Sequence, residues 1–288
     1  MTVRYYNIAR CTIGVEGEHE LELLARLPGF GVFAVAAGEP DLVVSFGHTV
    51  EIPQQEPLHR FDFEESGYSC RYYGTGTERV FVMERDGGKL YALRQADSHA
   101  WASSVDEPSA LRFLIWMAMS IYGTPRGLAP VHAACISFEN QAVAFLGESG
   151  TGKSTHAQLW LKNVAGTKLL NDDSPILRVG QNRAELFGSP WSGKTHCYSN
   201  IGLPLRALVR LNQRATNSIE PLNMLHAIAA IEPSLPPALR YDEAMTDHRL
   251  TMIARLTRLC GVFAMGCRPD DEAARMCQAA CFGTRQGD

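Results

Sequence analysis

A glycine-rich stretch, Gly-Glu-Ser-Gly-Thr-Gly-Lys-Ser-Thr at residues 147–155, constrains this chain more than any other feature. It fits the pattern GxxxxGK[ST], in which glycines let backbone N–H groups surround phosphate oxygens and the following helix N-terminus adds partial positive charge. An apolar, β-prone run at 142–146 precedes it and a helical pattern at 154–162 follows it. This context predicts a phosphate-binding loop (P-loop, or Walker A) in an α/β fold.

Each position of the stretch has an expected role. The lysine would place a full charge on the β- and γ-phosphates of a nucleotide, and the serine hydroxyl would ligate Mg²⁺. The expected ligands are therefore ATP and Mg²⁺. The residues expected to bind them are Gly147, Glu148, Ser149, Gly150, Thr151, Gly152, Lys153, Ser154 and Thr155. The alternative is a glycine turn that binds nothing.

Two adjacent acidic residues, Asp172 and Asp173, follow a short apolar segment. An acidic residue just after a buried strand is the expected Mg²⁺ partner of a phosphate-binding loop. Two are more than that role needs, so one could hold the metal while the other accepts a proton from an attacking hydroxyl. We expect both to be catalytic. The alternative is that one of them caps a turn before Pro175.

A second segment bounded by glycines, Gly-Ser-Pro-Trp-Ser-Gly-Lys at 188–194, follows another β-prone run. Its glycines would let the segment bring Lys194 to a phosphate. Trp191 lies in this segment, and aromatic residues on loops often stack on ligands. We expect Lys194 to contribute to catalysis. The alternative is a surface turn with a solvated lysine.

His132 opens the first of two β-prone runs, 131–138 and 141–146, which we expect to pair as a hairpin that leads into the P-loop. A lone histidine is more often structural than catalytic. Strand ends beside a phosphate loop, however, face the binding site in open α/β sheets. We therefore include His132 among the catalytic residues.

The sequence texture changes about a third of the way along the chain. Residues 1–104 consist mainly of short β-rich segments, of which 79–84 and 89–93 should form a hairpin and 31–36 a strand. Strand and helix patterns then alternate, which predicts an α/β core. We predict a small β-rich N-terminal domain over residues 1–104 and a P-loop domain over residues 105–288.

Charge and hydrophobicity exclude several classes of protein. The net charge is −4, so a polyanion binder is disfavoured. The longest apolar run, residues 113–119, is far shorter than a membrane span, and the first residues lack the apolar core of a signal peptide. The eight cysteines form no repeated framework, which favours reduced thiols. We expect a cytoplasmic protein that binds neither nucleic acid nor membrane.

Several of these motifs together resemble a known family. The Val-His-Ala strand at 131–133, the hairpin, GESGTGKST and Leu-Leu-Asn-Asp-Asp at 169–173 resemble, in this order, the catalytic domain of HPr kinase/phosphorylase. The core of that family is related to the ATP-dependent phosphoenolpyruvate carboxykinases. The segment GSPWSGK resembles a loop of HPr-kinase-like proteins of the peptide-maturation type, including lasso-peptide kinases. The resemblance covers about residues 128–212.

Three departures from the family pattern weigh against HPr itself as the acceptor and against reverse phosphorolysis. Thr155 stands where HPr kinases usually have Glu, and Ala133 replaces the glycine after the histidine. The arginine-bearing segment QVRPGRN of true HPr kinases has no counterpart.

The resemblance implies an ATP-dependent kinase that transfers a phosphoryl group to a Ser or Thr hydroxyl of a peptide or protein. It implies that Ser154 and Asp173 hold Mg²⁺ and that Asp172 or Asp173 takes the acceptor proton. Three alternatives stay open: a kinase of a small molecule such as free serine, a nucleotide-binding regulatory module without transfer, and a hydrolytic ATPase motor, which is disfavoured because the sequence shows no distinct arginine finger or ring-forming segment. The sequence leaves open the acceptor, the phosphate donor (ATP, ADP or another), the role of residues 1–104 and the oligomeric state.

Overall fold

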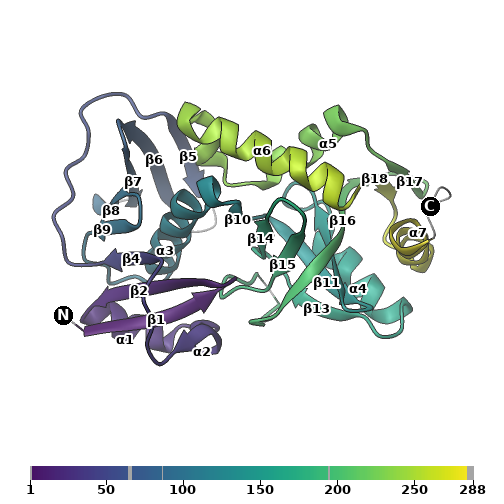
Figure 1. Ribbon diagram of the computed structural model, residues 1–288, viewed down its shortest axis with the longest axis horizontal. Helices are drawn as coiled ribbons and strands as arrows, with labels where there is room; N and C mark the ends of the chain where they lie inside the picture. The colour runs from purple at the N-terminus through teal and green to yellow at the C-terminus, as the bar shows by residue number, and fades with distance from the viewer. Residues whose placement is uncertain (1, 64–66, 86, 194, 284–288) are drawn as a thin grey trace. The chain divides into compact units, whose positions relative to one another are not determined.

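The computed structural model describes residues 2–63, 67–85, 87–193 and 195–283. The chain forms two compact units, one from Met1–Arg126 and Pro237–His248, the other from Gly127–Pro236 and Arg249–Asp288. Both are built on a mixed β-sheet with helices (Figure 1). Within the described residues, no helix combines the length and the apolar character that a membrane span requires.

The sheet of the first unit has the strand order β3-β1-β2-β4-β9-β8-β7-β6-β5. Its elements are β1 (Thr2–Ile8), β2 (Cys11–Gly17), α1 (His19–Arg26), α2 (Phe30–Phe33), β3 (Ala34–Val35), β4 (Leu42–Ser45), β5 (His59–Phe63), β6 (Tyr68–Thr75), β7 (Glu78–Arg85), β8 (Lys89–Ala96), β9 (His99–Ala102) and α3 (Pro108–Gly123). The expected hairpin forms between β7 and β8. The strand predicted at 31–36 is confirmed only at β3, residues 34–35. The first half of the segment belongs to the helical turn α2, in which Phe30 and Phe33, three residues apart, are both buried.

The first unit extends past residue 104, where the sequence pattern placed the domain boundary. Helix α3 contacts β4, β7 and β8, and its residues Leu111 and Leu114 are fully buried. The helix therefore completes the core of this unit. Residues 237–248 also belong to it, although they lie more than 100 positions further along the chain.

The sheet of the second unit has the order β10-β14-β15-β16-β12-β11-β13, and β18 pairs with β16 and β17. Its elements are β10 (Leu128–Pro130), β11 (Ala133–Phe138), β12 (Gln141–Leu146), α4 (Lys153–Asn163), β13 (Lys168–Asn171), β14 (Ile176–Val179), β15 (Ala184–Phe187), β16 (Gly202–Gln213), β17 (Ser218–Pro221), α5 (Met224–Ile231), β18 (Gly261–Cys267) and α7 (Asp271–Phe282). Helix α6 (Glu243–Leu259) starts in the first unit and ends in the second.

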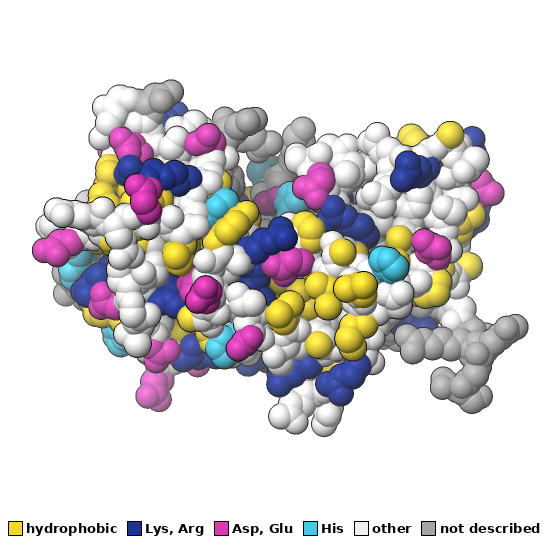
Figure 2. Space-filling model, turned by 90° about the horizontal axis from the view of Figure 1, so that it is seen from above, with side chains coloured by type: hydrophobic (Ala, Val, Ile, Leu, Met, Phe, Trp, Pro, Cys, Tyr) yellow, Lys and Arg dark blue, Asp and Glu magenta, His cyan; other side chains and the backbone are white. Residues whose placement is uncertain are grey.

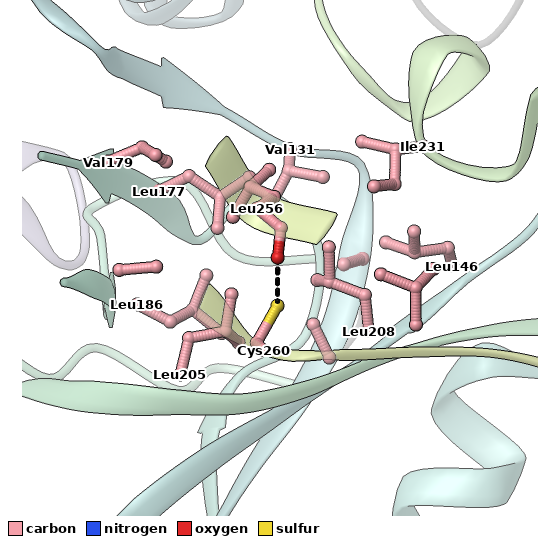
Figure 3. Close-up of a cluster of buried hydrophobic side chains, with 14 of the residues drawn as sticks. Val131, Leu146, Leu177, Val179, Leu186, Leu205, Leu208, Ile231, Leu256 and Cys260 are labelled. Carbon is pink, nitrogen blue, oxygen red and sulfur yellow. Dashed lines mark hydrogen bonds between the residues drawn. The ribbon is translucent and has the colours of Figure 1, made fainter. Parts of the chain in front are cut away.

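The central strands of this sheet are buried on both faces. Along β12, Val143 and Phe145 pack in one core with Trp160 of α4, whereas Ala144 and Leu146 belong to the core on the opposite face. That second core includes α5 and the end of α6, where the Cys260 thiol donates a hydrogen bond to the Leu256 carbonyl over 3.2 Å (Figure 3). The alternation follows from the period of two in a β-strand. It gives the unit three layers: helix, sheet, helix.

The strand directions bring three parts of the candidate site to one edge of the sheet. β11 is antiparallel to both β12 and β13, so β12 and β13 run in the same direction, and β16 is parallel to β12. The residues after Leu146 and after Asn171 therefore meet at the edge where β11 begins and β16 ends. This edge contains the segments 147–153, 172–173 and the residue His132.

Charged side chains of both signs lie on the surface beside exposed hydrophobic ones (Figure 2). Basic and acidic side chains are interspersed over the face seen in Figure 2. The eight cysteines are free thiols, and all but Cys197 are buried. They thus serve as small apolar side chains in the two units.

Candidate active site

The glycine-rich segment forms a loop between a strand and a helix. β12 ends at Leu146, and α4 begins at Lys153 with Gly152 as its N-cap in the left-handed conformation, φ 96°. Residues with side chains rarely adopt that conformation, so glycine is needed there. The first N–H groups of α4 have no partner within the helix, which makes the loop a natural anion site.

Lys153 lies folded over this loop. Its Nζ donates to the carbonyls of Gly147 and Glu148, at 2.9 and 3.0 Å, and lies 2.8 Å from Nε2 of His132. The residue is only 9% exposed. Burial lowers the pKa of Lys153, and the nearby Arg210 charge acts in the same direction, whereas Asp173 and Glu148 oppose the shift. Several charges therefore surround the Lys153 ammonium.

His132 connects the lysine to the acidic pair. Since the Lys153 ammonium can only donate, Nε2 of His132 accepts, and the ring hydrogen belongs on Nδ1. Nδ1 lies 3.6 Å from Oδ1 of Asp173. The backbone fixes this position, because the N–H of His132 donates to Ser234 and that of Ala133 donates to the Asp173 carbonyl. The structure thus brings His132, Lys153 and Asp173 together.

Asn171 shapes the turn that carries the two aspartates. Its side-chain oxygen accepts from the backbone N–H groups of Asp173 (3.0 Å) and Ser174 (2.9 Å). Its side-chain NH₂ donates to the Trp191 carbonyl over 3.1 Å and to Ser189. Asn171 is fully buried. Asn171 was not among the site residues predicted from the sequence. An Asn just before a turn is nevertheless typical of an Asx-turn, in which the side chain accepts from the backbone two residues later.

The two aspartates differ in their surroundings. The side chain of Asp173 is 42% exposed, so solvent and ligands can reach it. Asp172 is 7% exposed, and its Oδ2 accepts from the N–H of Thr195 over 3.2 Å. Its other oxygen, Oδ1, is buried and has no hydrogen-bond partner among the residues that the structure describes. A buried carboxylate oxygen without a partner is costly, which makes Asp172 a candidate for a functional role.

The segment 188–193 packs directly on this turn. A Cβ added to Gly193 would lie 3.0 Å from the Asp172 carbonyl oxygen, a tight contact that a side chain at this position could make only if the neighbouring backbone shifted slightly. Trp191 is 5% exposed, which corrects the expectation of a ring available to stack on a ligand. The ring is buried because the Asn171 and Ser189 hydrogen bonds hold its backbone against the turn. Lys194, the catalytic lysine expected here, lies outside the described residues.

Two side chains of β16, Arg210 and Gln213, donate hydrogen bonds to the loop. Neither residue was among those predicted from the sequence. Arg210 is paired in register with Leu146, the last residue of β12, and its Nη2 donates to Oε1 of Glu148 over 2.6 Å. Gln213 donates to the Gly150 carbonyl over 3.2 Å. Both residues reach the loop because β16 pairs in parallel with β12. No local sequence pattern predicts that pairing.

The remaining loop residues are accessible. Ser149, Ser154 and Thr155 are exposed, with Ser154 in the first turn of α4. The described residues contain no cluster of three or more His, Cys, Asp or Glu side chains that could hold a metal alone. Mg²⁺ commonly takes one or two protein ligands and completes its shell with water and phosphate oxygens. Ser154 and Asp173 fit that smaller requirement.

Comparisons with known proteins give little beyond this geometry. No protein-family model matches the chain. No curated protein matches it. Among solved structures, the HPr(Ser) kinase/phosphatase from Coxiella burnetii is similar over 52% of this chain and 91% of that chain, with 12% identity and a TM-score of 0.29. A TM-score this low supports no conclusion about activity, so the geometry of the site alone supports the proposal below.

Proposed function

We propose that this protein is an ATP-dependent phosphotransferase that moves a phosphoryl group onto a hydroxyl. The observation that carries the proposal is one sheet edge that combines a glycine-rich loop, a buried lysine and a buried carboxylate oxygen that has no partner among the described residues. Anion-binding and proton-accepting groups side by side are what transfer to a hydroxyl requires. A regulatory module that only binds nucleotide has no use for the unpaired carboxylate.

The loop and Lys153 would bind the phosphates of ATP. In doing so Lys153 exchanges the carbonyls of Gly147 and Glu148 for charged phosphate oxygens, which are stronger partners for an ammonium group. Ser154 and Asp173 would hold Mg²⁺, which supplies positive charge to the transferred group.

Transfer also needs a group that accepts the proton of the attacking hydroxyl. Asp172 has a carboxylate oxygen free for this task, whereas Asp173 faces His132 and is exposed enough to meet the metal. His132, which bridges Lys153 and Asp173, would keep both in position. Asn171 would fix the turn so that the two carboxylates point in different directions.

The acceptor proposed here is a Ser or Thr hydroxyl of a peptide or protein. The motif resemblance described above favours this class, and Lys194 would assist by reaching the transferred phosphoryl group. Free serine would use the same residues and is the alternative acceptor.

Two measurements test the function. Lys153→Ala removes the charge that faces the phosphates, so calorimetry with MgATP should show binding weaker by about 1–3 kcal/mol, the range for charge-assisted hydrogen bonds. Mass spectrometry of peptide mixtures incubated with the protein and MgATP should reveal a gain of one phosphate on Ser or Thr. Equal affinities in calorimetry would mean that the loop binds no phosphate. Phosphorylated free serine without peptide products would favour the small-molecule alternative.

A further inference from the structure

Arg210 is a charged side chain at the site that the proposed reaction leaves without a task. It lies on β16, beside the last residue of β12, and its side chain is 18% exposed. Nη2 donates to Glu148, but Nη1 is buried and has no hydrogen-bond partner in the part of the chain that the structure describes. A buried guanidinium N–H without a partner is costly. An acceptor that arrives with a ligand would satisfy it.

The position of Arg210 shows what that acceptor is. Its charge is one of the influences that lower the pKa of Lys153, after the larger effect of burial. The two cations also contact the same loop residue: Lys153 donates to the Glu148 carbonyl over 3.0 Å, and Arg210 donates to the Glu148 carboxylate over 2.6 Å. Two close positive charges in a partly buried site repel each other unless an anion joins them. Guanidinium groups bind phosphate oxygens through two parallel hydrogen bonds.

In the structure Glu148 forms an ion pair with Arg210, but the two side chains differ in their exposure to solvent. The Glu148 side chain is 70% exposed, so it can turn into solvent, whereas Arg210 is held by the strand. An ion pair with one exposed partner contributes little stability. A phosphate carries more negative charge than a carboxylate and is held at the same time by Lys153 and the backbone of the loop.

We infer that Arg210 is a second phosphate-binding cation of this site and that Glu148 is its replaceable counter-ion, displaced when the phosphate chain of a nucleotide enters. The strand order indicates from which side Arg210 would approach the nucleotide. β16 and β13, which carry Arg210 and the Asp172–Asp173 turn, lie on opposite sides of β12, with β11 between β12 and β13. Arg210 therefore approaches the phosphates from the side away from the acidic pair, and it serves to bind nucleotide rather than to transfer phosphate. This inference rests on the proposed function.

Calorimetry with MgATP and with MgADP on four variants tests it. Arg210→Gln should weaken the binding of both nucleotides by about 10–100-fold, the equivalent of losing hydrogen bonds between charged groups. Glu148→Gln removes the competing carboxylate and should tighten both by about 2–5-fold. The double variant should bind as weakly as Arg210→Gln, because the gain from Glu148→Gln requires the arginine. Arg206→Gln is the matched control on the same strand: its Nε donates to the Cys281 carbonyl, and the nucleotide affinity should not change.

The outcomes separate this inference from the proposed function. If Lys153→Ala loses binding while Arg210→Gln binds as the unaltered protein does, the inference fails and the proposed function stands. If the unaltered protein binds neither nucleotide, the proposed function fails as well. Thermal unfolding of each variant without nucleotide shows whether Arg210→Gln folds. If it does not fold, Glu148→Gln, which alters an exposed side chain, decides: unchanged or weaker binding of both nucleotides overturns the inference.

Discussion

Each unit of the molecule contains a buried cluster of charged side chains, and the two clusters differ in how they are paired. In the first unit, Asp242 accepts hydrogen bonds from Arg79, through Nε and through Nη2 at 3.1 Å, and from the Tyr72 hydroxyl at 2.9 Å. In the second unit, Asp172 and Arg210 each keep one buried atom without a partner in the described chain. A paired cluster stabilises the fold, whereas an incomplete one has room for a ligand.

The largest effect expected from this comparison concerns transfer activity. Asp172→Asn and Asp173→Asn keep the size of the side chain and remove its charge. Asp172→Asn lacks the proposed proton acceptor. Its turnover should fall about 10²–10⁴-fold while it still binds MgATP. Single-turnover transfer from MgATP to a peptide found by mass spectrometry to accept phosphate measures this, with Asp271→Asn in α7, whose side chain is 43% exposed, as control. If both variants transfer phosphate at the normal rate, the pair only caps a turn.

Stability should respond in the opposite way at the two clusters. Asp242→Asn leaves the buried Arg79 charge without its counter-ion, so the free energy of unfolding should fall by about 3–5 kcal/mol. Asp172→Asn removes a buried charge of which one oxygen has no partner in the described chain, and it should leave stability unchanged or raise it by up to about 1 kcal/mol. Urea unfolding of both variants provides the comparison. A similar loss in both would show that the Asp172 cluster is as structural as that of Asp242.

A smaller effect concerns acid stability. His156 in α4 packs edge-on against Phe145, with ring centroids 4.7 Å apart, and burial lowers its pKa to about 4. In the unfolded chain His156 has its ordinary pKa of about 6.5 and binds the proton more readily than in the folded protein. The contribution of neutral His156 to the free energy of unfolding is therefore complete above pH 6.5 and is lost as the pH falls towards 4. Between pH 7 and pH 5 the loss should be about 2 kcal/mol. Urea unfolding at both pH values should show it, and His156→Leu should abolish this part of the pH dependence. An unchanged dependence in His156→Leu would assign it to other groups.

Much of the fold was predictable because local patterns specify it. The hairpin of β11 and β12, helix α6 and the strand–loop–helix unit around Lys153 each depend on residues close together in the sequence. The predictions failed where local signals were weak. The segment 31–36 has an apolar pattern that fits a strand or a buried helical turn, and the packing of Phe30 and Phe33 decided between them. The short strands β2, β9 and β17 lacked a distinctive pattern and become strands through their partners.

The sequence by itself determined the candidate chemistry of this protein: the glycine-rich loop, Lys153, the two aspartates and the histidine at the head of β11. These are contiguous motifs whose residue types already limit what they can bind. Only the tertiary structure decided which of them meet and in what state. The burial of Trp191, the surroundings of Asp172 and the approach of Arg210 to the loop all depend on contacts between segments 20 to 62 positions apart. Strand pairing creates such contacts, and strand pairing is set by the packing of the whole sheet rather than by any one segment.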